Sequence, residues 1–289
     1  MKTQLADLTG KTALITGASN GIGKAAAFAL AEAGAELVLV CRNRQLAHDT
    51  AAAIKHRTGN RRVDYLLADL SSQAEVRRVA GEFLASGKPL HILLNNAGGL
   101  FMERQETVDG LELTFALNHL GYFLLTHLLL ERLRQSGPAR IVNVASRAHK
   151  GASEGLNFDD LQSKRQYNGL RAYATSKLAN ILFSRELARR LRGSEVTTNS
   201  LHPGFVATRF GYDSSPLMRT ALQLLRPFQR SIDKGSRTSI YLCAAPAAEG
   251  ISGQYFSDCR SVRPSRFGED DDAAQRLWAV SERLTGLAG

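Results

Sequence analysis

The stretch that decides the fold is Thr16-Gly17-Ala18-Ser19-Asn20-Gly21-Ile22-Gly23. It lies between an apolar run, Thr12–Thr16, and an Ala-rich segment of helical period, Gly23–Ala33. Glycines at such a junction let the backbone turn sharply and approach a pyrophosphate, which the N-terminus of the next helix attracts. Because the spacing differs from Gly-x-Gly-x-x-Gly, an incidental glycine turn remains the alternative. The setting favours a dinucleotide site formed by Gly17, Ser19, Asn20, Gly21, Ile22 and Gly23.

Short apolar runs alternate with stretches of helical period along the whole chain. The early runs are almost entirely apolar, as is typical of strands that helices cover on both faces. This pattern predicts an α/β fold, a single Rossmann-like domain over residues 1–289 with a doubly wound parallel sheet of seven strands. The expected strands are Thr12–Thr16, Glu36–Cys41, Val63–Leu67, His91–Asn95, Arg140–Ala145, Val196–Leu201 and Gly253–Phe256. The expected helices are Gly23–Ala33, Leu46–Arg57, Ala74–Ala85, Leu113–Arg134, Ala172–Arg192 and Lys234–Ala244.

Composition limits the classes of partner and the compartment. The net charge of +10, from 37 basic and 27 acidic residues, favours anionic partners. No nucleic-acid partner is expected, because the arginines are scattered and no nucleic-acid-binding motif accompanies them. Cys41, Cys243 and Cys259 have neither disulfide nor zinc spacing, which indicates a reducing, cytoplasmic setting without a metal site. The longest apolar run, Gly121–Leu130, is too short to cross a bilayer, and the N-terminus lacks the apolar segment of a signal peptide.

The end of the second expected strand bears on the choice of cofactor. An Asp or Glu there would bind the free 2′-hydroxyl of NAD, but this chain has Cys41-Arg42-Asn43-Arg44. No carboxylate repels a 2′-phosphate, and the Arg42 guanidinium can bind one in a bidentate manner. The sequence therefore favours NADP(H), with Arg42 as the chief contact and Asn43 beside it. The alternative is that Arg42 and Arg44 are solvated loop residues.

Tyr173 and Lys177 stand at positions i and i+4, one turn apart on the same face of an expected helix. A phenol near pKa 10 is a poor acid or base at neutral pH, and a neighbouring cation lowers that pKa. Alone, the pair is a weak signal, since most such pairs are surface residues.

Together these motifs resemble the short-chain dehydrogenase/reductase family. The matching pieces occur in family order: Thr16–Gly23, Asp69-Leu70, Asn95-Asn96-Ala97-Gly98, Asn118, Ser146, Tyr173–Lys177 and Pro203-Gly204. A further set resembles the retinol dehydrogenase branch: Asn157–Leu161, Ser176–Phe183, Asn199–Gly204, Gly253–Cys259 and Arg276-Leu277-Trp278. That branch uses mainly NADP and interconverts retinoids or other lipophilic aldehydes and ketones with their alcohols. Animal members often carry an N-terminal membrane segment; this chain begins at its first strand, which leaves membrane attachment and retinoid specificity open, with peripheral membrane contact as one alternative.

The resemblance implies a role for each matching residue. Tyr173 would exchange a proton with the carbonyl oxygen, and Lys177 would lower the pKa of Tyr173 and bind the nicotinamide ribose. Ser146 would hydrogen-bond the same carbonyl, and Asn118 would support Lys177 through ordered water. The remaining cofactor contacts would be Asp69, Leu70, Asn95, Ala97, Gly98, Pro203, Gly204, Val206 and Thr208.

Several of these residues have a structural alternative. Ser146 could bond the backbone, Asn118 could cap or kink its helix, and Asp69 could cap the helix after Ser71. Thr208 could simply belong to a turn. Asn96 is expected to join neighbouring strands, His119 and His202 to be structural, and His149 either to be structural or to line the substrate pocket.

Substrate specificity is expected to come from the segments Arg147–Leu170 and Arg209–Ile232. The second has an apolar stripe formed by Leu217, Met218, Ala221, Leu222, Leu224 and Leu225, and predicts a lid near 209–232. A membrane-surface helix and an ordinary packed helix are the alternatives. The long helices Leu113–Arg134 and Ala172–Arg192 could form a four-helix contact in a homodimer or homotetramer.

The leading functional hypothesis is an NADP-dependent oxidoreductase for a lipophilic, retinal-like aldehyde or ketone. Within the same class, the alternative substrates are steroids, quinones and small xenobiotic carbonyls. A different class is a non-catalytic NADPH-sensing protein, against which the presence of Asn118, Ser146, Tyr173 and Lys177 argues.

Overall fold

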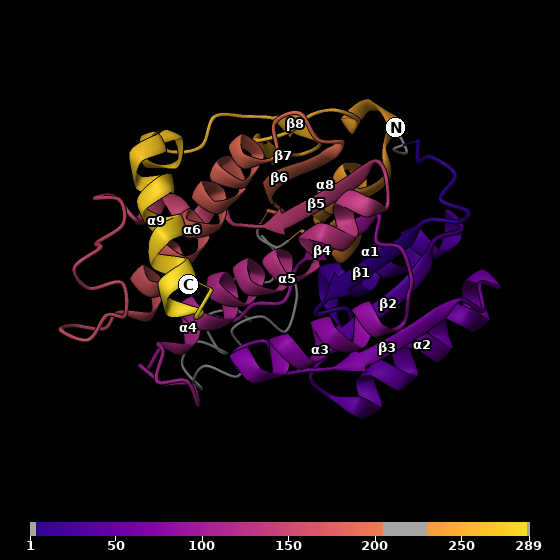
Figure 1. Cartoon of the computed structure of the whole chain (residues 1–289), viewed down its shortest axis with the longest axis horizontal. Coiled ribbons are helices and arrows are strands. Elements are labelled where there is room, and N and C mark those ends of the chain that lie inside the picture. Colours follow the sequence, from indigo (N-terminus) through magenta and orange to yellow (C-terminus); the bar gives the residue numbers. More distant parts are fainter. Residues whose placement is uncertain (1–3, 205–229, 288–289) are drawn as a thin grey trace.

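The computed structural model describes residues 4–204 and 230–287. Its centre is one twisted sheet with the strand order β3-β2-β1-β4-β5-β6-β7-β8, running from β3 at one edge to β7 and β8 at the other (Figure 1). All neighbouring pairs are parallel except β7 and β8. The strands are β1 (Thr12–Thr16), β2 (Glu36–Cys41), β3 (Val63–Leu67), β4 (Ile92–Asn95), β5 (Ala139–Val144), β6 (Val196–His202), β7 (Tyr255–Ser257) and β8 (Arg260–Ser261).

The predicted fold class is confirmed, with one more strand than expected. The additional strand, β8, folds back on β7 through Asp258 and Cys259, which both have positive φ. Two central residues with positive φ are the requirement of the tightest hairpin turns, but Asp-Cys is not a common pair there. Because the sequence has no glycine at this turn, β8 could not be predicted from it.

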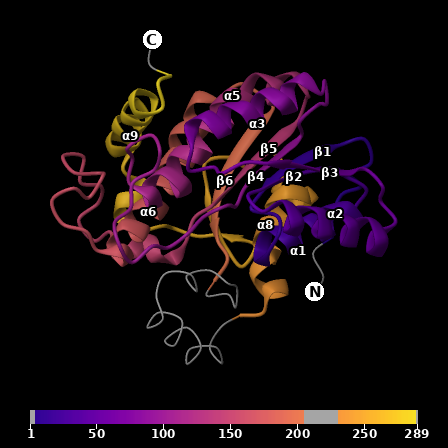
Figure 2. The same ribbon diagram turned by 90° about the horizontal axis from the view of Figure 1, so that it is seen from below.

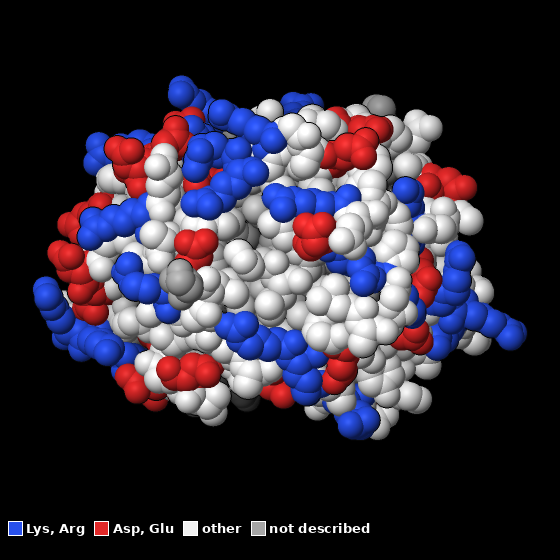
Figure 3. Space-filling view, viewed as in Figure 1, with Lys and Arg blue, Asp and Glu red and all other residues white. Residues whose placement is uncertain are grey.

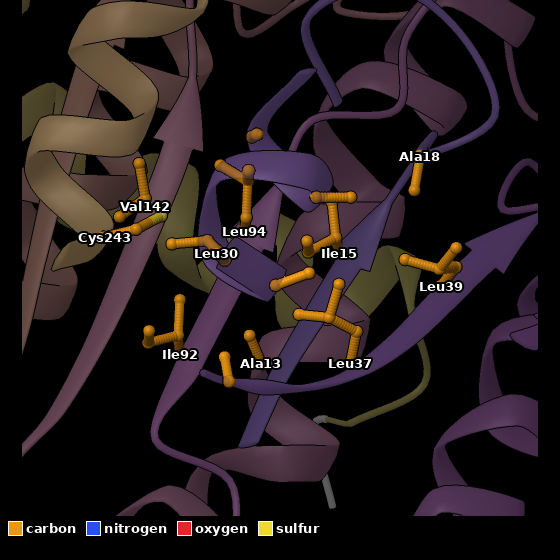
Figure 4. Packing of buried hydrophobic residues seen from close by; sticks show 14 of the residues in the cluster. Ala13, Ile15, Ala18, Leu30, Leu37, Leu39, Ile92, Leu94, Val142 and Cys243 are labelled. Atoms are coloured by element: carbon orange, nitrogen blue, oxygen red, sulfur yellow. The ribbon is translucent and has the colours of Figure 1, made fainter. Parts of the chain in front are cut away.

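Helices cover both faces of the sheet. One face carries α1 (Gly21–Glu32), α2 (Arg44–Thr58) and α8 (Ile232–Ala244), and the other α3 (Gln73–Ala85), α5 (Gly121–Gln135) and α6 (Gly169–Arg190) (Figure 2). Figure 4 shows Ala13 and Ile15 of β1 packed with Leu30 of α1 and Cys243 of α8. All five residues of β1 are buried, which explains why its centre, Ala13-Leu14-Ile15, is apolar on both faces.

The first three strands have the expected bounds, and the other strand bounds differ by at most two residues. Four helices, α2, α3, α6 and α8, begin one to three residues earlier than expected, each behind a residue whose side chain caps it. Asn43 accepts a hydrogen bond from the Leu46 N–H, so α2 begins at Arg44. In the same way, Asn168 accepts from the Arg171 N–H, and α6 begins at Gly169.

The expected helix Leu113–Arg134 is not regular. It consists of a short α4 (Leu113–Phe115), a π-helical turn η1 (Ala116–Leu120) and α5. By length and composition the whole helix Leu113–Gln135 could cross a membrane, contrary to the expectation from sequence. However, 72% of its most apolar window is buried within the fold, as in the core helix of an α/β protein.

A C-terminal helix, α9 (Asp271–Leu284), was not expected. It lies beside α6 in both views (Figures 1 and 2), with Leu277 and Trp278 buried. An ion pair of 2.5 Å between Arg185 and Asp271 and the Arg190 guanidinium, 4.2 Å from the Trp278 ring, join the two helices. α9 therefore occupies part of the α6 surface that the sequence offered for contact between chains.

The proposed lid near 209–232 lies largely outside the described residues. Its last three residues belong to the entry into α8: Arg230 pairs with Asp258, Ser231 caps the helix and Ile232 begins it. Three short 3-10 turns complete the described structure, η2 (Arg147–Gly151), η4 (Pro246–Ala248) and η5 (Arg266–Glu269).

Candidate active site

The candidate site lies at the carboxyl ends of the parallel strands. The sheet grows from β1 in both directions, because β2 and β4 flank it, and the helices that follow β1 and β4 cover opposite faces. Such a switch point is where α/β sheets bind their ligands. It brings the glycine turn after β1 next to the segment after β4: a Cβ on Gly17 would lie 2.8 Å from the Ala97 Cα.

The glycine turn after β1 is tightly packed and needs its glycines. Gly17 and Gly21 have φ of 65° and 55°, and a Cβ on Gly23 would lie 2.5 Å from both the Asn96 Nδ2 and the Gly17 oxygen. Asn96 donates hydrogen bonds from its Nδ2 to the backbone oxygens of Thr16 and Gly17, which confirms its expected role in joining β1 to β4.

The N-terminus of α1 can accept an anion. Asn20 makes no side-chain cap, and the first turn has no acidic residue. Its amide groups and the positive end of the helix dipole therefore remain available to a phosphate. Together with the close approach of Gly17 to the next strand, this arrangement fits the pyrophosphate of a dinucleotide.

The end of β2 presents two exposed arginines. The side chains of Arg42 and Arg44 have no hydrogen-bond or ion-pair partner within the described part of the chain, and the first acidic residue after the strand, Asp49, is bonded to Gln45. Asn43 differs from its expected role, since its side chain caps α2. Burial raises the pKa of the Cys41 thiol, which bonds the Ser19 side chain beneath the glycine turn.

The fold gives the side chains of three expected cofactor contacts, Asn95, Leu70 and Asp69, partners of their own. Asn95 is completely buried, and its Nδ2 donates to Thr126 and Asn143 at 2.9 Å, so this side chain belongs to the core rather than lying along the adenosine. The Leu70 side chain is also in the core. Asp69 accepts hydrogen bonds from Ser71, while Ser72 caps α3, so the capping alternative for Asp69 is wrong.

Tyr173 and Lys177 project from α6 toward the end of β5. The Lys177 ammonium is almost completely buried, donates to the Val144 oxygen at 3.0 Å and lies 5.6 Å from the centre of the Tyr173 ring. Burial lowers the pKa of Lys177 to about 7. Burial also raises the pKa of Tyr173 to about 12, against the smaller, opposite effect of its hydrogen bond with the Ser146 side chain. Burial thus raises the pKa of Tyr173, whereas the i, i+4 spacing alone suggested a lowered one.

Asn118 lies in the π-helical turn, a feature often found at functional sites. Its Oδ1 accepts from the Gly99 N–H at 2.8 Å, and its Nδ2 donates to the Gly99 oxygen and to Ser176. The side chain thus fixes the segment after β4. A Cβ on Gly98 would lie 2.9 Å from the Asn118 Oδ1 and 3.5 Å from the Lys177 Nζ, so both side chains border Gly98.

Ser146 follows β5 and begins the turn η2, where its Oγ accepts from the Ala148 N–H. It therefore has the backbone role given as an alternative, in addition to its bond with Tyr173. His149 is fully buried and its ring bonds the Ser146 oxygen and the Ser265 N–H, so it is structural and does not line a pocket.

The two other histidines near the site are also structural. His119 bonds Ser281 at 2.9 Å, and burial lowers its pKa to about 3. His202 accepts from the Gly204 N–H and contacts Ser257, and burial, aided by Arg230, lowers its pKa to about 4. Val206 and Thr208 lie outside the described residues.

A pocket of about 460 Å³ opens beside the first turn of α6. It lies within the first segment expected to determine specificity, and an ion pair of 2.7 Å between Arg171 and Glu154 crosses its lining. The lining residues are Gly151, Ser153, Glu154, Gln166, Asn168, Leu170 and Arg171.

Charged side chains are spread over the surface in Figure 3, and the described residues form no metal site. On the face shown in Figure 3, Lys and Arg are dispersed among acidic residues rather than gathered in one tract. Residues 4–204 and 230–287 contain no group of three or more His, Cys, Asp or Glu side chains that could hold a metal ion.

Comparison with known proteins agrees with this geometry. A model of the short chain dehydrogenase family matches residues 11–216. The sheet, the glycine turn and the Ser-Tyr-Lys group thus define a nicotinamide-dependent oxidoreductase of alcohols and carbonyls, and the chain belongs to the short-chain dehydrogenase/reductase family.

Its relatives place it in the retinol dehydrogenase-like branch of that family. The chain is 44% identical to retinol dehydrogenase 11 of Mus musculus over 285 residues, covering 99% of this chain and 89% of that protein. It is 44% identical to retinol dehydrogenase 12 of Homo sapiens over 280 residues, covering 97% and 88%.

Among solved structures, a protein from Mycobacterium paratuberculosis superimposes with a TM-score of 0.77 at 32% identity, covering 98% of this chain and 96% of that one. RhlG of Pseudomonas aeruginosa, solved as an active-site complex with NADP, gives a TM-score of 0.68 at 29% identity, covering 86% and 95%.

Proposed function

We propose that this protein is an NADP-dependent oxidoreductase that interconverts a lipophilic aldehyde or ketone, of the retinal type, with its alcohol. The observation that carries the proposal is the convergence of Ser146, Tyr173 and Lys177 at the end of β5, beside a glycine turn shaped for a dinucleotide. The retinol dehydrogenase relatives support the substrate class, and the RhlG complex supports the cofactor.

The preference for NADP(H) rests on Arg42. Its guanidinium is exposed at the end of β2, without a partner in the part of the chain that the structure describes, and no carboxylate stands beside it. A 2′-phosphate would find there a free bidentate donor, and nothing would bind the 2′-hydroxyl of NAD in its place. Arg44, the exposed first residue of α2, is a second donor.

The residues that would hold the cofactor follow the strand ends. The pyrophosphate would lie against the turn formed by Gly17, Ser19, Asn20, Gly21, Ile22 and Gly23. Asp69, Ala97 and Gly98 would border the adenosine and the riboses, and Pro203, Gly204, Val206 and Thr208 the nicotinamide. When bound, the cofactor supplies or accepts the hydride at the reacting carbon.

The chain itself contributes the proton and the electrostatics. At neutral pH a phenol with a pKa of about 12 is protonated, so Tyr173 is ready to donate to a carbonyl oxygen during reduction. The Ser146 hydroxyl, already bonded to Tyr173, would be the second donor to that oxygen and stabilise its developing charge. Lys177 would bind the ribose and favour the phenolate after proton transfer. Asn118 would hold the Gly98–Gly99 segment against Lys177.

Two segments, one polar and one apolar, would determine which carbonyl the enzyme accepts. The described pocket beside α6 has polar residues and an ion pair in its lining, whereas the segment 209–232 carries the apolar stripe. We propose that the stripe covers the lipophilic part of the substrate and lies close to the membrane surface in a cytoplasmic enzyme. We also propose that α9 prevents the four-helix contact between chains, so a homodimer or homotetramer would use another surface.

A screen of carbonyl substrates, followed by the consumption of NADPH or NADH, tests the function. The purified protein would be assayed with NADPH or NADH against retinal, alkanals, steroids and quinones, with Tyr173→Phe as the matched control. Turnover of retinal with NADPH, lost in Tyr173→Phe, is the expected result. Turnover restricted to steroids, quinones or xenobiotics would select the second substrate class. NADPH binding without turnover of any carbonyl would instead indicate the cofactor-sensing protein.

A further inference from the structure

The Lys177 ammonium has an unusual environment for a buried cation. It is 3% exposed, and no carboxylate within the described residues forms an ion pair with it or raises its pKa. A buried charge normally needs an opposite charge or several hydrogen bonds. Among the described residues, the Lys177 Nζ donates one hydrogen bond, to the Val144 oxygen at 3.0 Å.

Two aromatic rings complete this environment. The Lys177 Nζ lies 5.6 Å from the centre of the Tyr173 ring and 5.7 Å from the centre of the Tyr122 ring. Tyr122 projects from the first turn of α5 and is 1% exposed. Its Oη is buried and has no hydrogen-bond partner in the described parts of the chain. What Tyr122 offers its surroundings is therefore the face of its ring and not its hydroxyl.

From this geometry we infer that Tyr122 is a positioning residue. Its ring holds the Lys177 ammonium in the active site by a cation–π interaction, in place of a counter-ion. The inference rests on the proposed function of Lys177. An aromatic face attracts a cation within about 6 Å, and the attraction is stronger where water is excluded. Because the Tyr122 ring is uncharged, it supports the ammonium without competing for its protons, which remain free to bind hydroxyl groups.

Within residues 4–204 and 230–287, the other groups that face Lys177 have no permanent charge. Tyr173 comes from α6, the Val144 oxygen from β5, and the Asn118 side chain from the π-helical turn, close to Gly98. Burial alone lowers the pKa of Lys177, to about 7. Loss of a ring that favours the ammonium would lower that pKa further, and because the value lies near neutrality the change would alter the charge of the site at working pH.

Two substitutions separate the ring from the hydroxyl. Tyr122→Phe keeps the ring and removes an Oη that bonds nothing, whereas Tyr122→Leu keeps an apolar side chain but removes the ring. The titration of Lys177 would be followed by NMR of the protein with 13Cε-labelled lysine, and its signal assigned by its absence in Lys177→Met. This measurement needs neither substrate nor turnover, so it is independent of the proposed function.

We expect the pKa of Lys177 in Tyr122→Phe to equal that of the unsubstituted protein, and in Tyr122→Leu to fall by about half a unit or more. Where turnover is found, the pH at which kcat/KM changes would move in the same direction in Tyr122→Leu alone. Equal pKa values in the Phe and Leu variants would overturn the inference and leave Tyr122 a packing residue. If the Leu variant does not fold, Tyr122→Met gives the same comparison with a flexible apolar side chain. If no carbonyl substrate is turned over but the pKa of Lys177 still depends on the Tyr122 ring, the enzyme function is refuted and the cation–π interaction stands.

Discussion

The imidazole of His149 accepts a hydrogen bond of 3.0 Å from the backbone N–H of Ser265, 116 positions further along the chain. Its other nitrogen lies 2.7 Å from the Ser146 oxygen, which can only accept. The two partners therefore fix one tautomer, with the proton on Nδ1 and a lone pair on Nε2. Through this ring the residue after β5, central to the candidate site, is joined to the C-terminal segment that precedes α9.

Replacing His149 tests this connection. His149→Leu would leave the Ser265 N–H without its acceptor, and we expect the free energy of unfolding to fall by about 1–3 kcal/mol. His149→Gln retains an acceptor that can reach Ser265 and should recover most of that loss. Urea denaturation of the three proteins measures the difference; a Gln variant as unstable as the Leu variant would show that the ring matters only by its shape.

Arg42 should decide between the two nicotinamide cofactors. In Arg42→Glu the loss of a charge-assisted bond to the 2′-phosphate, worth about 1.5–3 kcal/mol, should weaken NADPH binding by about 10- to 100-fold. NADH, which lacks that phosphate, should bind as well as before or better. Fluorescence titration gives both dissociation constants. Arg44→Glu, which removes the proposed second donor, should cause a smaller loss, and an equal loss there would show that the whole basic surface, not Arg42, attracts the phosphate.

Tyr173→Phe should reduce carbonyl turnover by about 100-fold or more, because the variant lacks the only group proposed to transfer the proton. The affinity for NADPH should change little, since the ring and its packing remain. Steady-state rates and cofactor titration on the same preparation check both statements. Undiminished turnover in the Phe variant would assign the proton to another group, for which the Ser146 hydroxyl is the nearest choice.

Features that depend on residues close together in the sequence could be predicted, whereas those that depend on distant partners could not. The glycine turn and the strand Thr12–Thr16 carry their own signals, so both were expected where the structure has them. The neighbouring residues Asn95 and Asn96 show the limit. Asn95 turns into the core because Thr126 and Asn143 offer partners there, and those partners are 31 and 48 positions away.

Burial explains why the pKa of Tyr173 differs from the value that the sequence suggested. The i, i+4 spacing correctly places Lys177 one turn from Tyr173, and it suggests a cation that lowers the phenol pKa. It contains no information on how deeply the fold encloses both groups, and enclosure raises the pKa of Tyr173. The helix α9 is different, because its signal was present in the sequence: Asp270 caps it, and Ala274, Leu277, Trp278 and Ser281 follow at helical spacing on the buried face.

Acid should destabilise this protein through its buried histidines. His119 is fully buried, and its pKa falls from 6.5 to about 3 on folding. Below pH 6.5 the unfolded chain binds a proton that folded His119 does not, so the stability falls as the pH falls; above pH 6.5 neither state binds it and the effect vanishes. The slope from this one residue is about 1.4 kcal/mol for each pH unit between 6.5 and 3. His202, with a pKa of about 4, adds a second contribution over much of the same range.

Urea denaturation at several pH values between 4.5 and 8 would measure that slope. His119→Phe, which places a ring among Phe115, Phe123 and Phe183, should lose its share of the pH dependence. The comparison uses slopes and not absolute stabilities, so the loss of the Ser281 bond does not affect it. His48→Gln is the matched control because the His48 side chain is 64% exposed. If the slope of the His119 variant equalled that of the unsubstituted protein, the acid sensitivity would come from other groups and His119 would titrate alike in both states.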